Sequence, residues 1–180
     1  ADTNKVNDKI SLLLFLREST SDVYYRKSTT TRKEFIHGER NIIFKDIFDL
    51  QGISYFINSM YMDVNFYNNA IDLLTLQFVS PLSPIAPTIY RFYIQDTVLI
   101  DNTPCIHMYF APRNKTDLAF IGHLWIAHDS TYAIRKIEVG IPKDINLNWV
   151  NEMQISQEYS WYGSTPEDRG LMLSKDEIFM

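Results

Sequence analysis

The stretch "LAFIGHLWIAHDSTYAIRKIEVGI" (Leu118–Ile141) decides the fold of this chain, because two apolar segments with alternating polar residues flank a short polar one. Alternation with a period of two predicts strands with one wet face. The intervening "HDST" (His128–Thr131) is typical of a turn, since Asp and Ser side chains bond their own backbone. The stretch therefore predicts a β-hairpin. On its first strand, one face carries Phe120, Gly122, Leu124 and Ile126, and the other carries His123 and Trp125.

Strand signals continue on both sides of this hairpin, separated by short polar loops. The predicted strands are Ile89–Ile100, Cys105–Ala111, Leu118–Ala127, Tyr132–Ile141 and Trp149–Trp161. Such short loops join consecutive antiparallel strands, whereas parallel crossovers need about a dozen residues or more. Residues 88–162 are therefore predicted to form an antiparallel meander, and residues 163–180 a tail.

The first half of the chain, residues 1–87, gives a weaker pattern. "NDKISLLLFLREST" (Asn7–Thr20) is compatible with a short helix or an extended segment, and Ala70–Val79 is compatible with either. Phe44–Met62 mixes helical spacing with an interrupting glycine. The prolines of "SPLSPIAP" (Ser80–Pro87) exclude helix interior and central strand. We expect one to three helices in this half.

The fold class predicted from these patterns is α+β, in a single domain over residues 1–180. We expect a curved antiparallel sheet of six or more strands, with a few helices packed on one face. The polar start and abrupt end of the sequence lead us to expect a piece excised from a longer protein.

Charge and composition exclude several partners. The net charge of −5 does not favour nucleic acid. One basic run, Tyr24–Phe35, is interpreted as a solvated loop or edge. The longest apolar run, "LLLFL" (Leu12–Leu16), is far shorter than a membrane span.

Catalytic motifs are not evident. His128, Asp129 and Ser130 are adjacent in a predicted turn and cannot converge as a catalytic triad. The single cysteine, Cys105, is interpreted as a small core filler, because neither a helix N-terminus nor a cationic pocket is suggested around it. We expect no catalytic residues and no cofactor.

His107 and His123 are candidate metal ligands. If the loop between their strands centres near Lys115, His107 lies opposite His123, and Cys105 lies opposite Trp125. Facing side chains of an antiparallel pair can share a metal ion. The alternative is that both histidines are amphipathic fillers on a half-exposed face.

The continuous apolar face of the predicted sheet is a candidate ligand site. If the sheet is curved and partly open, this face can hold a lipid or another apolar ligand. If helices cover it, the same face is a closed core. The residues that would line the site are Tyr90, Phe92, Phe120, Leu124, Ile126, Met153 and Tyr159.

Several segments resemble a family of unknown function from Bacteroidetes. The resemblance spans residues 11–25, 63–97, 105–134 and 144–159, and "FVSPLSP" (Phe78–Pro84) is among its most specific parts. It implies a module of a large outer-membrane-associated protein, at the periplasmic face of the outer membrane. Such proteins carry a carboxypeptidase-regulatory-like β-sandwich before this region and a part resembling an outer-membrane β-barrel after it.

The hairpin also resembles, more distantly, the half-barrel of lipoprotein carriers (LolA/LolB-like). The residues that carry this similarity are Phe110, Pro112, Gly122, Trp125 and Ile126. In that fold a curved antiparallel sheet cups an acyl chain beneath helices, so the resemblance implies lipid binding.

The leading hypothesis is a non-enzymatic periplasmic interaction or structural module. Its expected partners are other domains of the same longer protein or another envelope protein. The alternative is binding of a lipid or other apolar ligand in the concave face of the sheet. A remote alternative is a metal-dependent or hydrolytic enzyme.

Overall fold

The computed structural model describes part of the chain, and its two compact units, Ala1–Ser59 and Met60–Met180, are described separately. The described backbone covers residues 3–6, 9–12, 15–26, 31–43, 64–147, 152–165 and 169–179. The described side chains are those of residues 18–24, 32–40, 64–147, 152–165 and 169–179.

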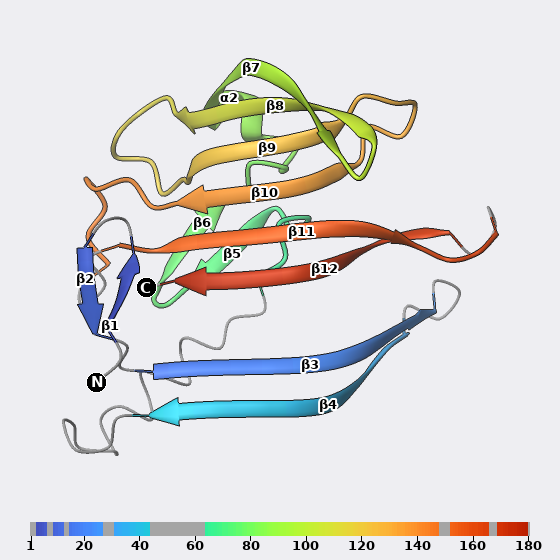
Figure 1. The fold of residues 1–180 in the computed structure, drawn as a ribbon. Coiled ribbons are helices and arrows are strands. Elements are labelled where there is room, and N and C mark those ends of the chain that lie inside the picture. Colours follow the sequence, from blue (N-terminus) through green and yellow to red (C-terminus); the bar gives the residue numbers. More distant parts are fainter. Residues whose placement is uncertain are drawn as a thin grey trace. The chain divides into compact units, whose positions relative to one another are not determined.

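The described part of the first unit consists of two antiparallel hairpins (Figure 1). Their strands are β1 (Thr3–Val6) with β2 (Lys9–Leu12), and β3 (Phe15–Arg26) with β4 (Thr31–Ile43). The described backbone of Asn7–Thr20 is therefore strand and not helix. The helical spacing noted in Phe44–Met62 lies outside the described residues.

The second unit is built on a six-stranded antiparallel sheet whose strands follow one another in sequence order, β7 to β12 (Figure 1). This order confirms the predicted meander. The sixth strand comes from residues expected to form a tail, for which no strand was predicted. The strands are β7 (Tyr90–Ile100), β8 (Thr103–Pro112), β9 (Ile121–Ala127), β10 (Ile134–Gly140), β11 (Gln154–Tyr162) and β12 (Gly170–Phe179).

The fold is mostly β, which corrects the predicted α+β class. The described residues contain one short helix, α2 (Ala86–Ile89), with a proline in its first turn. Ala70–Val79 forms the hairpin of β5 (Ala70–Leu73) and β6 (Leu76–Val79), and no described helix is long and apolar enough to cross a membrane.

The sheet is neither closed nor strongly curled, so the expected half-barrel does not form (Figure 1). β7 and β12 are its two edges. Among the residues that the structure describes, the cover of the sheet comes from a short hairpin and one helical turn.

One face of the sheet, the inner face, packs against the β5–β6 hairpin and forms the core. Phe120 lies between Phe78 and Phe66, with ring centroids 5.0 and 5.8 Å away. The Tyr90 hydroxyl donates to the Val79 carbonyl and accepts from the Phe120 N–H at 3.0 Å. The largest fully buried side chains are Tyr90, Phe66, Phe78, Phe110, Phe120, Leu73, Ile137, Met153, Ile155 and Gln157.

The hairpin turns place the strands in register. β7 and β8 are joined by Asp101 and Asn102, both with positive φ (47° and 60°), which is the type I′ arrangement that hairpins favour. This turn lies in the short polar loop predicted between Ile89–Ile100 and Cys105–Ala111, and it confirms that prediction.

The predicted register between β8 and β9 is wrong. His107 lies opposite Trp125, and Cys105 lies opposite Ala127. The observed pairs place the centre of the loop at Thr116 instead of Lys115. Beside the loop, the Leu118 carbonyl accepts from the Val79 N–H at 3.0 Å.

Candidate interaction face

The face of the sheet opposite the core, the outer face, is organised in two rows of side chains that cross all six strands. Directly opposite residues of neighbouring strands stack side by side. The tyrosine row consists of Tyr93, Tyr109, His123, Glu138, Ser156 and Glu177. The tryptophan row consists of Asp96, His107, Trp125, Lys136, Glu158 and Lys175. Aromatic rings thus lie over β7–β9 and charges over β10–β12.

Three side chains of these rows form a hydrogen-bonded chain. The Asp96 carboxylate oxygen lies 2.8 Å from Nδ1 of His107, and Nε2 of His107 lies 2.9 Å from Nδ1 of His123. A carboxylate has no hydrogen to give, so Nδ1 of His107 donates to it. In the second hydrogen bond, between Nε2 of His107 and Nδ1 of His123, the tautomers decide which ring donates. One proton occupies the gap between the two rings.

Aromatic packing fixes the two imidazoles in place. The Trp125 indole stacks on the His107 ring, with centroids 4.6 Å apart and planes 4° from parallel. The Tyr109 ring lies 5.3 Å from that of His123. The Lys136 ammonium is 5.4 Å from the Trp125 ring centre, within reach of a cation–π interaction. The result is a half-exposed platform of aromatic and imidazole rings.

The protonation of His123 follows from these surroundings. Burial lowers the pKa of its imidazole below the usual value, the neighbouring His107 lowers it further, and Glu138 partly offsets both. Burial and the neighbouring His107 therefore favour the neutral form of His123.

The charges over β10–β12 are paired with one another. Lys136 lies 2.8 Å from Glu138 and 3.3 Å from Glu158, and Lys175 lies 2.7 Å from Glu177. The hydrogen bond to Glu138 is the main cause of the raised pKa of Lys136. Because these opposite charges alternate, this half of the outer face does not present a patch of one sign.

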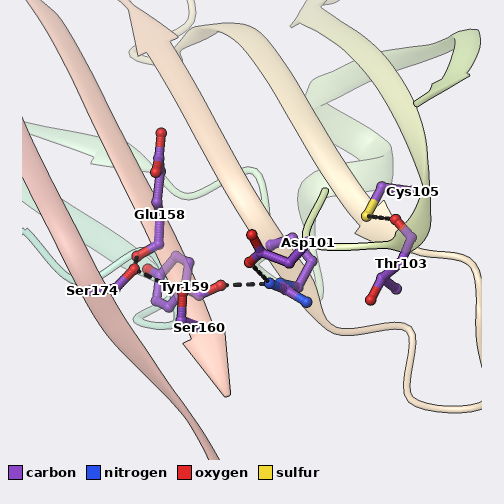
Figure 2. Close-up of polar contacts among 8 residues, drawn as sticks. Asp101, Thr103, Cys105, Glu158, Tyr159, Ser160 and Ser174 are labelled. Atoms are coloured by element: carbon purple, nitrogen blue, oxygen red, sulfur yellow. Dashed lines mark hydrogen bonds and ion pairs between the residues drawn. The ribbon is translucent and has the colours of Figure 1, made fainter. Parts of the chain in front are cut away.

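A buried arginine occupies the end of the sheet near the β7–β8 turn. The Arg135 side chain is 3% exposed. It donates to the Asp101 carboxylate at 2.6 Å and, through Nε, to the Tyr159 carbonyl at 3.0 Å. Figure 2 shows dashed lines that reach Asp101 and Tyr159 from one guanidinium. The arginine thus ties the turn to β11, which is a structural role.

Cys105 lies in the same region, where its Sγ is 3.5 Å from the Thr103 carbonyl (Figure 2). The cysteine is buried, and burial is the main cause of a pKa above the ordinary thiol value. A protonated, buried thiol is a poor nucleophile. This placement favours the interpretation of Cys105 as a core filler.

The seven residues predicted to line an apolar ligand site all belong to the packed inner face. Tyr90, Phe120, Leu124, Met153 and Tyr159 are buried, and Phe92 and Ile126 are partly buried against the same cluster. Side chains of β5 and β6 fill the space in front of them. None of the seven lines either of the two main surface hollows found among the described residues.

The two predicted metal ligands are brought together, but diagonally rather than directly across the strands. Among the residues that the structure describes, no group of three or more His, Cys, Asp or Glu side chains is arranged to hold a metal ion. The rings of His107 and His123 instead use each other as hydrogen-bond partners.

Sequence reasoning did not include the rest of this face in the site. Tyr109 and Trp125 share the strand parity of the histidines, so the period-two pattern was a usable signal for them. Asp96 has the opposite parity to Tyr93 and joins the same face only through a β-bulge at Gln95, between Ile94 and Asp96. A bulge leaves no mark in a period-two pattern.

A protein-family model described as "Family of unknown function (DUF5686)" matches residues 2–169. No curated protein and no solved structure is similar enough to the chain to count as a match.

Proposed function

We propose that this chain, which belongs to the family of unknown function DUF5686, is a non-enzymatic interaction module whose outer sheet face docks another protein domain. The observation that carries the proposal is the contrast between the two faces. The inner face is a filled core, whereas the outer face presents Tyr93, Tyr109 and Trp125 partly to solvent around a fixed histidine pair.

The residue types of the platform suit a protein partner. Tyr and Trp are enriched at protein interfaces, where their rings bury much area at low cost in conformational entropy. In this chain the rings are already held by neighbours, since Trp125 stacks on His107 and Tyr109 packs against His123. A preorganised surface loses less entropy on binding.

The paired charges of the outer face also bear on the partner. Lys136 and Lys175 each have an acidic neighbour within 3 Å, so the face offers little net charge to steer a nucleic acid or an anionic surface. The partner we propose is another domain of a longer envelope polypeptide, at the periplasmic face of the outer membrane. Support for this location is the sequence resemblance to large outer-membrane-associated proteins.

The non-enzymatic part of the proposal rests on how the reactive groups are placed. The buried Cys105 has a raised pKa, and His107 and His123 lie on the outer sheet face and line neither of the surface hollows around Ile145 and around Trp161. Catalytic nucleophiles and bases work in concave, water-excluding sites.

Site-specific photo-crosslinking in the intact polypeptide, in living cells, tests the docking face. A benzophenone amino acid replaces Tyr93 or Tyr109 on the outer face, and Tyr132 or Leu173 at exposed control positions off the platform. We expect crosslinks to one defined protein segment from the outer-face positions and a much lower yield from the controls. Equal yields at all four positions, or none at any, would contradict the proposal.

The alternative of an apolar ligand rests on the distant resemblance of the hairpin to lipoprotein carriers. It requires the β5–β6 hairpin to leave the inner face, because Phe78 and Phe120 occupy that space in contact. Native mass spectrometry of the purified chain separates the two proposals. A retained lipid whose loss accompanies Phe120→Ala, but not Tyr109→Ala, would favour the ligand.

A further inference from the structure

The free edge of β7 is less protected against strand pairing than the other edge of the sheet. Among the described residues, β7 pairs only with β8, and its exposed side chains include Ile94 (70% exposed) and Leu99 (73% exposed). The opposite edge, β12, carries the charged run Lys175–Glu177. Charged residues protect edges, whereas exposed apolar edges invite a further strand.

We propose that β7 pairs antiparallel with β7 of a second copy of this chain, with Tyr93 on the two-fold axis. The two sheets would then form one continuous sheet across the axis. Because such an interface is isologous, every contact occurs twice.

The register about Tyr93 follows from which side chains share a face. Directly opposite residues of an antiparallel pair point to the same side of the sheet. Phe92 is on the inner face, and it would lie opposite Ile94 of the second copy, which is also on the inner face. The pairing covers apolar surface that is exposed in the single chain.

The bulge at Gln95 brings opposite charges together in this register. Gln95 has no partner on β8, so Asp96 returns to the outer face, where it bonds His107. Arg91 is also on the outer face, two residues before Tyr93. If Gln95 is likewise unpaired across the axis, Arg91 lies opposite Asp96 of the second copy, and cross-strand pairs of opposite charge are favourable.

Oxidative crosslinking of Tyr93→Cys tests the register. Opposite residues of an antiparallel pair have Cα atoms about 4.5–5.5 Å apart, which lies within the range of about 4.4–6.8 Å that a disulfide spans. Thr97→Cys, exposed on the same strand, is the matched control, because its two copies would lie far apart along the strands. The native Cys105 is buried and does not compete.

We expect the Tyr93→Cys chain to form a disulfide-linked dimer at protein concentrations at which Thr97→Cys forms no covalent dimer. A wild-type chain that sediments as a monomer throughout, or crosslinking through Thr97→Cys at the same rate, overturns the proposal.

A charge exchange provides a second test by analytical ultracentrifugation. Arg91→Asp places two acidic groups opposite each other, and we expect dimer affinity to fall about 10-fold or more, which corresponds to about 1.4 kcal/mol. Adding Asp96→Arg restores opposite charges and is expected to recover affinity. Circular dichroism shows whether each variant folds, and failure of a folded double variant to recover counts against this register.

This interface shares Tyr93 and Asp96 with the docking face, whereas Tyr109 on β8 and Trp125 on β9 lie outside it. Ile94→Lys is expected to abolish the dimer while outer-face crosslinks from Tyr109 persist, so the failure of one proposal is distinguishable from the failure of the other.

Discussion

At the scale of single residues, Gly122 is a position where the sheet has no room for a side chain. A Cβ atom at Gly122 would collide with the carbonyl oxygen of Glu138 and lie 2.9 Å from Cα of Val139. β9 and β10 approach each other closely there, so only glycine fits. The glycine of the hairpin signature therefore has a packing explanation.

We predict that Gly122→Ala lowers the free energy of unfolding by about 1–3 kcal/mol, as overpacking of a tight site does. Gly170→Ala is the control, because a Cβ at Gly170 meets nothing within 4 Å. It is expected to change stability by no more than about 0.5 kcal/mol. Urea denaturation measures both, and an equal effect of the two substitutions would refute the packing explanation.

His123 gives the outer face a pH dependence. Its pKa is lower in the folded chain than the ordinary value of 6.5, so the unfolded chain binds more protons. The contribution of His123 to stability is therefore expected to be fully present above pH 6.5. It is lost as the pH falls through 6.5 and then through the lower pKa of the folded chain. The physical cause is burial of the imidazole, which disfavours its charged form, together with the neighbouring His107.

We predict that the loss of stability between pH 7.5 and pH 5.5 is smaller in His123→Gln than in the wild type. His128→Gln, in the exposed β9–β10 turn, is the matched control and is expected to keep the full dependence. Chemical denaturation at the two pH values makes the comparison. An unchanged pH dependence in His123→Gln would show that this imidazole is not the responsible group.

At the scale of elements, Tyr90 connects three segments far apart in sequence. Its ring packs edge-on to that of Phe110, 5.5 Å away, while its hydroxyl bonds the Val79 carbonyl after β6 and the Phe120 N–H before β9. The proline-rich segment Ser80–Pro87 predicted an interruption of regular secondary structure between β6 and β7, but the sequence did not predict this contact. The contact depends on the loop before β9, which also sets the register.

We predict that Tyr90→Phe destabilises the chain by about 1–3 kcal/mol, because the buried N–H of Phe120 and the partly buried carbonyl of Val79 lose their partner. Tyr93→Phe, which removes a hydroxyl from a half-exposed ring, is expected to cost no more than about 0.5 kcal/mol. Thermal denaturation ranks the two. Equal melting temperatures would argue against the role of the Tyr90 hydroxyl.

Strands and turns were more readable from the sequence than pairing was. β7, β8, β9, β10 and β11 all carry the period-two pattern, because one face is core and the other is wet. The register of β8 against β9 was not readable, because moving the loop centre from Lys115 to Thr116 leaves the same side chains on each face of the sheet. β12 was not predicted as a strand, because Ser174–Glu177 is polar and the strand lies at an edge of the sheet.

At the scale of the whole second unit, the sequence indicated two sheet faces but not what would cover each. The apolar face was correctly assigned, since Phe120, Gly122 and Leu124 are buried. Its cover is the β5–β6 hairpin, and Ala70–Val79 had been compatible with helix or strand. A short apolar run without clear periodicity does not distinguish helix from strand. The sequence therefore could not predict that this segment covers the inner face.

Gln157 illustrates how the sealed face is held. Its side chain is buried, donates to the Val64 carbonyl at 2.7 Å and accepts from the Tyr159 hydroxyl at 2.8 Å. The glutamine thereby anchors the segment before β5 to β11. A polar residue among inner-facing apolar ones breaks the alternation pattern, yet every polar atom finds a partner.

Hydroxyl-radical footprinting tests the central claim, that the outer face docks a protein domain, most directly. Oxidation of Tyr93, Tyr109 and Trp125 would be compared between the isolated chain and the intact polypeptide in cells, with the exposed Tyr132 as the internal control. We predict strong protection of the three outer-face rings in the intact polypeptide and little change at Tyr132. Equal oxidation of the outer-face rings in both settings would contradict the claim.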